Sequence, residues 1–194
     1  MKVLQEIEGM DIYLLDQLMK GTVNKNQRIL DAGCGAGRNL KFLLNNKFNC
    51  VAIDPKEEII SKLRLFFPEN KDQFFNSTIE DFQDSAGYDS IICNAVLHFA
   101  CNNEHFEMMF DKLIALLRPN GILFIRTASD IGLNLSTVFS NGAYQLPEVS
   151  SRYLITEKKV VELLNKYPIE LNEPIKTVNI NNRRCMTTLV IAKL

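Results

Sequence analysis

Short apolar runs alternate with helical patterns along most of the chain. Strands are expected at Arg28–Ala32 and Cys50–Asp54, and the segment between them, 38–46, carries apolar residues at helical spacing. The alternation continues with strands at Phe74–Thr78, Tyr88–Cys93 and Ile122–Thr127 and with helices at 55–66, 104–117 and 156–166. An alternation of this kind predicts a parallel sheet that is covered by helices on both faces.

The two ends of the chain modify this pattern. Apolar residues at helical spacing predict one N-terminal helix over residues 1–21, with Gly21 placed to end it. Near the other end, a strand within Ile169–Ile180 and a final strand at Met186–Ala192 flank a polar segment, 181–184, that is typical of a hairpin turn. We therefore expect an α/β fold with a doubly wound sheet of seven mostly parallel strands, of which the last is antiparallel.

The length and composition are those of one globular domain. The chain has 194 residues, of which 46% are hydrophobic and 23% are charged, and these values suit a chain with one sizeable core. No internal repeat or low-complexity tract divides the sequence, and the longest stretch rich in Gly, Pro and Ser, 129–151, is expected to be a loop. We expect a single domain over residues 1–194.

Charge and cysteine content argue against several classes of protein. The 22 basic and 23 acidic residues give a net charge of -1, which does not favour nucleic-acid binding. No apolar run approaches the roughly 18 residues of a membrane-spanning helix, and Glu6 and Glu8 stand where a signal peptide would be apolar. The five cysteines are scattered without CxxC spacing, so neither a disulfide framework nor a zinc site is indicated. We expect a cytoplasmic protein with reduced thiols and no membrane attachment.

The segment Asp31–Gly37, with the sequence DAGCGAG, connects the first strand to its helix. Glycines at such a turn let the backbone approach a ligand closely. The spacing is GxGxG, whereas the dinucleotide fingerprint GxGxxG requires a third glycine at the position of Arg38. Asp54 ends the second strand, where a carboxylate can bind both hydroxyls of a ribose or, alternatively, cap the helix that follows. The turn and the acid together predict a nucleoside cofactor, and a pyrophosphate is not favoured.

The segment Ile29–Gly37 resembles motif I of the class I S-adenosylmethionine-dependent methyltransferases. Four further blocks resemble this family in order and spacing: Val51–Asp54, Glu80–Phe82, Tyr88–Asn94 and Leu116–Leu123. The last block departs from the family pattern L-(K/R)-P-G-G only at Asn120, a residue type that tolerates left-handed turn geometry. The resemblance covers residues 11–194 and implies a Rossmann-like fold, similar to the small-molecule branch that includes tellurite-resistance and ubiquinone-type methyltransferases.

The resemblance implies S-adenosyl-L-methionine as cofactor and S-adenosyl-L-homocysteine as product. Asp31 would receive the methionine ammonium group, and Asp54 would bind the ribose hydroxyls. Asp81 would accept a hydrogen bond from the adenine amino group, with Glu80 as the alternative acceptor. The N-terminal helix would lie over the mouth of the cofactor site. The other cofactor-binding positions that the resemblance implies are Gly33, Gly35, Gly37, Asn39, Phe82, Asn94 and Ala95.

Candidates for the acceptor side of the site follow the fourth and fifth strands. His98 is a candidate general base, although a histidine in an apolar run is often a structural residue or a pocket wall. The other histidine, His105, is expected to face solvent. The segment 129–153 interrupts the repeat where this family inserts a substrate cover, and long loops in compact domains are often functional. The residues expected to contact substrate are Arg126, Tyr144, Arg152 and Tyr153, of which the two arginines either pair with an anionic acceptor or are surface charges.

These observations predict an enzyme that transfers a methyl group to a small molecule by in-line displacement. The sulfonium is already a good leaving group, so the protein mainly has to align the reactants and exclude water. Alternatives are a methyltransferase that acts on tRNA or protein, and a module that binds the cofactor without catalysis. A nicotinamide dehydrogenase is disfavoured by the glycine spacing and the terminal hairpin. The acceptor atom stays open, and the protein is expected to be a monomer or a homodimer.

Overall fold

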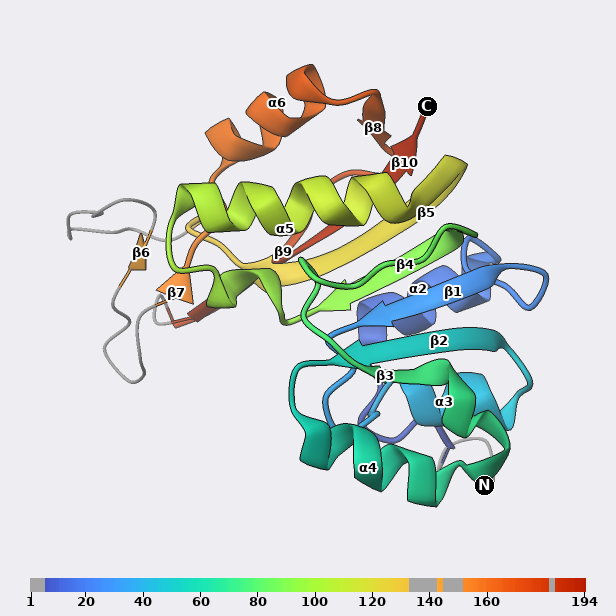
Figure 1. Ribbon diagram of the computed structural model, residues 1–194. Helices are drawn as coiled ribbons and strands as arrows, with labels where there is room; N and C mark the ends of the chain where they lie inside the picture. Colours follow the sequence, from blue (N-terminus) through green and yellow to red (C-terminus); the bar gives the residue numbers. More distant parts are fainter. Residues whose placement is uncertain (1–5, 133–142, 145–151, 182–183) are drawn as a thin grey trace.

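A mixed eight-stranded sheet runs through the middle of the protein (Figure 1). The computed structural model describes residues 6–132, 143–144, 152–181 and 184–194. The strand order is β3-β2-β1-β4-β5-β10-β8, and β9 also pairs with β10. The strands of this sheet are β1 Arg28–Ala32, β2 Asn49–Asp54, β3 Phe74–Asn76, β4 Tyr88–Asn94, β5 Leu117–Ala128, β8 Ile169–Leu171, β9 Lys176–Ile180 and β10 Arg184–Lys193.

The strands from β3 to β5 pair in parallel, whereas β10 runs antiparallel to β5. The expected doubly wound sheet with an antiparallel last strand is therefore confirmed. Helices cover both faces of the sheet, as expected (Figure 1). One face is covered by α2 Ile12–Lys20, α3 Leu40–Asn45 and α4 Glu57–Phe66, and the other by α5 Asn103–Leu116 and α6 Glu157–Lys166.

Two hydrophobic cores, one on each face, explain why the central strands are apolar throughout. Leu30 and Val51 belong to the core that α5 and α6 complete, whereas their neighbours Ile29 and Cys50 belong to the core that α2, α3 and α4 complete. Successive side chains of a strand point to opposite faces, so both sets are buried, and are therefore mostly apolar, when helices cover both faces. The polar residues of these strands are consequently concentrated at their ends.

The sixth predicted strand is divided into two. β8 pairs with the end of β10, where Leu171 lies opposite Ile191, and β9 pairs with its beginning, where Lys176 lies opposite Thr188. The residues between β8 and β9 include Pro174, which has no N–H group to donate to the ladder. The expectation of seven strands in the sheet is therefore wrong by one. The expected hairpin between the last two strands is confirmed by the antiparallel pairing of β9 and β10.

The N-terminal helix is shorter than predicted. The backbone turns at Gly9, where φ is +78°, and α2 begins only at Ile12. Asp11 caps the helix, since its side chain accepts hydrogen bonds from the backbone N–H groups of Tyr13 and Leu14. Gly21 ends the helix in the left-handed conformation, as expected. A single helix over residues 1–21 is wrong because the glycine and the capping aspartate interrupt it.

The other element ends differ from the predictions by a few residues. β3 ends at Asn76, and α4 begins at Glu57. β5 begins at Leu117, earlier than predicted, and Asn120 within it adopts a φ of +61°, which agrees with the turn geometry expected at that position. Two short helices, η1 Pro68–Gln73 and η2 Leu97–Phe99, were not predicted.

Only parts of the predicted cover segment 129–153 are described. Within it, β6 Ala143–Tyr144 and β7 Arg152–Tyr153 form a two-stranded antiparallel pair. Residues 133–142 and 145–151 lie outside the described part of the chain. Among the helices of the described residues, none combines the length and the apolar character that crossing a membrane would need.

We expect Asp11→Ala to lower the free energy of unfolding by about 2 kcal/mol. The substitution removes the cap of α2 and also an ion pair at 2.9 Å between the carboxylate of Asp11 and Nε of Arg126. Urea denaturation followed by circular dichroism measures the change. Asp72→Ala is the control, because Asp72 is exposed and should change stability by no more than about 0.5 kcal/mol. Equal stability of the two variants would contradict the capping role.

Candidate functional site

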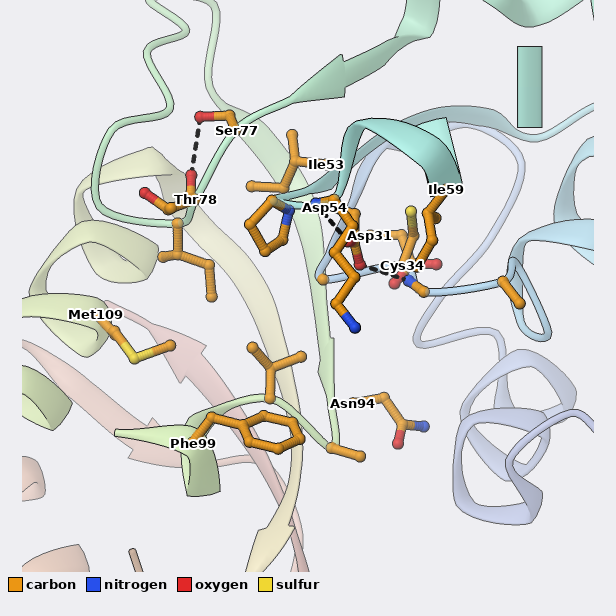
Figure 2. Close-up of a pocket in the computed structure, with 18 of the residues that line it drawn as sticks. Asp31, Cys34, Ile53, Asp54, Ile59, Ser77, Thr78, Asn94, Phe99 and Met109 are labelled. Carbon is orange, nitrogen blue, oxygen red and sulfur yellow. Dashed lines mark hydrogen bonds between the residues drawn. The ribbon is translucent and has the colours of Figure 1, made fainter. Parts of the chain in front are cut away.

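A cavity of about 670 Å³ opens at the carboxyl ends of β1, β2 and β4 (Figure 2). From β1 the chain crosses to β2 on one side, and β4 lies on the other side of β1. Ligands of open α/β sheets bind at such a switch point, because the connections diverge there and leave a crevice. The cavity lining includes eight of the predicted cofactor-binding residues: Asp31, Gly33, Gly35, Asn39, Asp54, Glu80, Asn94 and Ala95.

The glycine turn is held tightly against the two neighbouring strands. The backbone N–H groups of Gly33 and Cys34 donate to the carbonyl of Ile53 at the end of β2. Gly33 has a φ of +80°, and a Cβ atom on it would lie 2.5 Å from Cγ2 of Val96. A larger residue would therefore be strained and would clash with the segment after β4. Gly37 does not line the cavity, and its missing side chain makes room for Leu63 of α4.

Asp54 is buried at the end of β2 and points toward the glycine turn. One carboxylate oxygen accepts a hydrogen bond from the N–H of Gly35 at 3.0 Å, and the other accepts from the N–H of Lys56 at 3.0 Å. The first contact supports the turn, and the second supports the start of α4. Each oxygen keeps an additional lone pair, so the two roles considered for Asp54, capping and ribose binding, are compatible.

Asp31 is an ionisable residue in a buried position. Its side chain is 2% exposed, and Oδ2 has no hydrogen-bond partner among the described residues. Burial raises the pKa of this carboxyl to about 7; the nearby charge of Asp54 adds to the rise, and Arg38 opposes it. A buried carboxylate without a partner is costly. The cavity therefore presents an acceptor that is suited to a cationic donor on a ligand.

Asn94 contributes a hydrogen-bond donor at the end of β4. Its Oδ1 accepts a hydrogen bond from Nη2 of Arg38 at 3.0 Å, whereas its buried Nδ2 has no partner in the described structure. Asn39, also buried, accepts a hydrogen bond from the backbone N–H of Asp11 at 3.0 Å and so fixes the start of α2 beside the cavity. Arg38 lines the cavity and was not among the predicted site residues.

The block after β3 lines the cavity with a different set of residues than predicted. Ser77, Thr78, Ile79 and Glu80 line it (Figure 2 shows Ser77 and Thr78), whereas Asp81 and Phe82 do not. Asp81 is exposed, and its carboxylate accepts a hydrogen bond from the hydroxyl of Thr78 at 2.9 Å. Of the two acids considered for the adenine, Glu80 is the one in the cavity wall, and the adenine contacts themselves stay predictions.

His105 belongs to the cavity wall, contrary to the expectation that it faces solvent. Its Nε2 lies 2.5 Å from a carboxylate oxygen of Glu80, and its Nδ1 accepts a hydrogen bond from the N–H of Cys101. Because Nδ1 accepts, the neutral ring carries its proton on Nε2 and donates it to Glu80. The sequence placed His105 at the start of an amphipathic helix, and that pattern does not indicate that the first turn borders a cavity.

The far side of the cavity is apolar. Val96, Phe99 and Met109 line it, and Figure 2 shows Phe99 and Met109 on the side away from Cys34. Phe99 is 57% exposed, and the guanidinium of Arg152 lies 4.7 Å from the centre of its ring. An exposed aromatic ring beside a cation offers a surface for a flat ligand.

Among the described acceptor-side candidates, Arg126, Tyr153 and His98 are absent from the cavity lining. Arg126 is paired with Asp11, and Tyr153 is buried with its ring stacked on Phe106 at 4.6 Å. His98 is 8% exposed beside the ring of Phe99 and is absent from the lining, so its catalytic role stays a prediction. The side chain of Tyr144 is outside the described part of the structure.

Comparisons with known sequences agree with this geometry. Residues 29–121 match the model of a family described as "Methyltransferase domain". The chain is 29% identical over 129 residues to a ubiquinone biosynthesis O-methyltransferase of Rickettsia prowazekii, and the match covers 64% of this chain and 50% of that protein. With the corresponding enzyme of Rickettsia bellii the identity is 26% over 185 residues, which are 92% of this chain and 72% of that protein. The chain thus spans about half to three quarters of the length of these two relatives.

Solved structures share the fold at lower identity. An S-adenosylmethionine-dependent methyltransferase from Clostridium acetobutylicum has a TM-score of 0.70 at 14% identity, with 92% of this chain and 89% of that chain covered. The 1,6-didemethyltoxoflavin-N1-methyltransferase of Burkholderia thailandensis, solved with S-adenosylhomocysteine, has a TM-score of 0.68 at 19% identity, with 98% and 84% covered.

The sequence matches cover the glycine turn, Asp54 and the end of β4, which are the parts of the chain that build the cavity. The solved methyltransferases share the fold over 92% and 98% of this chain. The comparisons therefore agree with the motifs, which indicated the class I S-adenosylmethionine-dependent methyltransferases.

Proposed function

We propose that the protein transfers a methyl group from S-adenosyl-L-methionine to a small-molecule acceptor. The observation that carries this proposal is the presence of two buried polar atoms without a partner in the walls of one cavity. Oδ2 of Asp31 requires a donor, and Nδ2 of Asn94 requires an acceptor. The ammonium and carboxylate groups at the amino-acid end of the cofactor supply one of each, so the residues present fit this group.

When bound, S-adenosyl-L-methionine supplies a methyl group on a sulfonium that is ready to leave. Asp31 would hold the ammonium group, and Asp54 would accept hydrogen bonds from the ribose hydroxyls. Glu80, held by His105, would face the edge of the nucleobase. These contacts fix the position of a bound nucleoside relative to the apolar side of the cavity.

The chain contributes to the reaction mainly by alignment and by exclusion of water. The apolar wall of Val96, Phe99 and Met109 leaves little to solvate a small acceptor, so the acceptor loses water when it enters. Proper alignment of two reactants can lower a barrier by about 7–11 kcal/mol. No acid or base is required unless the acceptor atom carries a proton.

We propose an oxygen atom as the acceptor, because the two curated relatives are O-methyltransferases. A hydroxyl acceptor must lose its proton, and His98 is the predicted base for this step. The centre of the His98 ring lies 4.6 Å from that of Phe99, which lines the cavity. The side chains of Arg126 and Tyr153 are engaged elsewhere, and the guanidinium of Arg152 lies 4.7 Å from the ring centre of the lining residue Phe99.

We propose a monomer or a homodimer that works without nucleic acid. A net charge of -1 gives no general attraction to phosphates. The cytoplasm is the proposed compartment, because the five cysteines are free thiols, and Cys101 among them is exposed. A nicotinamide cofactor is not proposed, since the GxGxG spacing has Arg38 where the fingerprint for that cofactor needs glycine.

Calorimetric titration with S-adenosylmethionine and S-adenosylhomocysteine tests the cofactor. We expect micromolar binding that Asp54→Ala weakens at least about tenfold, because two hydrogen bonds to a charged acceptor are lost. Asp72→Ala, an exposed acid far from the lining residues, should bind like the wild type. Absence of binding to both compounds in the wild-type protein would overturn the proposed function.

The pH dependence of binding tests the role of Asp31. Its pKa of about 7 means that the carboxyl is largely protonated at pH 6 and must release a proton before it can pair with an ammonium group. Binding of S-adenosylhomocysteine should therefore tighten by about tenfold between pH 6 and pH 8. Calorimetry at pH 6 in buffers of different ionisation enthalpy should show proton release. In Asp31→Asn the affinity should be lower and independent of pH in this range, and a wild-type affinity that does not change with pH would contradict the role.

A further inference from the structure

The apolar side of the cavity combines an exposed aromatic ring with a cation. Phe99 lines the cavity from η2 and is 57% exposed. The guanidinium of Arg152, in β7, lies over this ring at 4.7 Å from its centre. Figure 2 shows Phe99 apart from Asp31 and Asp54. The ring and the cation therefore stand on a different side of the cavity from the acids that are proposed to hold the cofactor.

The position of Arg152 is fixed by its buried neighbour in β7. Tyr153 is 2% exposed, and its ring stacks on that of Phe106 in α5 with the ring centres 4.6 Å apart. Its hydroxyl donates a hydrogen bond to Oδ1 of Asn103 at 2.9 Å, so the polar end of this buried ring is satisfied. β7 also packs against η2, the short helix that carries Phe99. Arg152 thus projects from a strand that is attached to the same part of the fold as the ring it covers.

The charges of the cavity are divided between its walls. The three acids of the lining all belong to the walls that are proposed to hold the cofactor: Asp31, Asp54 and Glu80. The apolar wall is formed by uncharged side chains, and the guanidinium of Arg152 lies against one of them, Phe99. A cation beside an apolar surface attracts an anion more strongly than a cation in open water, because fewer polar groups screen it.

A flat acceptor with an acidic substituent matches both parts of this side. Its ring can stack on the exposed ring of Phe99. Its carboxylate can take two parallel hydrogen bonds from the guanidinium of Arg152, a geometry that suits a planar anion. An ammonium group would meet a like charge at this place, and a flexible neutral chain would use neither the ring nor the cation.

We infer that Arg152 and Phe99 are specificity-determining residues for the methyl acceptor, and that they select a planar acceptor that carries a carboxylate. Phe99 provides the surface for the ring of the acceptor, and Arg152 pairs with its carboxylate. This inference rests on the proposed function, and it adds the chemical class of the acceptor.

The test uses three probes, which are titrated by NMR into the protein saturated with S-adenosylhomocysteine. 2-Naphthoate is flat and anionic, 2-naphthamide is its neutral isostere, and decahydro-2-naphthoate has the charge without a flat ring. The wild type should bind 2-naphthoate at least about fivefold more tightly than either of the other probes. This comparison needs no substitution, so it does not depend on the folding of a variant.

Variants then assign the two parts of the preference. Arg152→Met should weaken binding of 2-naphthoate at least about fivefold and that of 2-naphthamide less than about twofold. Arg152→Lys should recover part of the affinity, because it restores the charge without the planar pair of donors. Phe99→Leu should weaken both flat probes and change decahydro-2-naphthoate by less than about twofold. Lys158→Met is the control, since Lys158 is an exposed cation of α6 and does not line the cavity.

Three results would overturn the inference: equal affinities of the wild type for 2-naphthoate and 2-naphthamide, no binding of 2-naphthoate, or the same loss in Lys158→Met as in Arg152→Met. Binding of S-adenosylhomocysteine is measured first in the same protein. If it is present, these results leave the proposed function standing. If it is absent, the proposed function fails, and this inference fails with it.

Discussion

The parallel pairing of β1 with β2 on one side and with β4 on the other is the constraint on which the site depends. Asp31, Asp54 and Asn94 are far apart in sequence, yet Asp54 and Asn94 end β2 and β4, and Asp31 is one residue before the end of β1. Because parallel strands bring their carboxyl ends to one edge of the sheet, the three polar side chains meet around a single cavity. The glycine turn completes the arrangement, since only Gly33 allows the backbone to lie against Val96. Without that close approach, the first and fourth strand ends would be separated by a side chain.

Electrostatics explains why the cavity favours a charged ligand. Oδ2 of Asp31 is buried without a partner among the described residues. Burial raises the pKa of this carboxyl to about 7, because Arg38 only partly offsets the loss of solvation and the charge of Asp54 adds to the rise. A protein that needed only stability would replace such a group with an apolar one. A cationic group on a ligand removes this cost, because it provides the partner that the fold leaves out. The energetic cost of this buried carboxylate thus becomes a contribution to the binding of a cation.

Arg126 was predicted to contact the substrate, but its side chain makes structural contacts at the start of α2. Arg126 follows the apolar part of β5 toward the site edge, which is where a substrate-binding cation would be expected. Its guanidinium instead pairs with Asp11, donates to Thr188 and lies 4.5 Å from the ring centre of Tyr13. These contacts attach α2 to the sheet next to the cavity. Arg38, which follows the glycines directly, is the arginine that lines the cavity.

The sequence by itself determined the order of strands and helices, the antiparallel end of the sheet, and the position of the glycine turn and of Asp54. These features depend on local periodicity and on residue types, such as glycine, that mark particular backbone geometries. They can therefore be predicted from the sequence without knowledge of the tertiary contacts. The tertiary structure alone decided that His105 joins Glu80 in the cavity wall, that Asp81 stays outside it, and that β8 and β9 pair with opposite ends of β10. Whether a polar side chain borders a cavity depends on which distant elements pack beside it. That packing, which also leaves Asp31 buried without a partner, arises from contacts between residues that are remote in sequence.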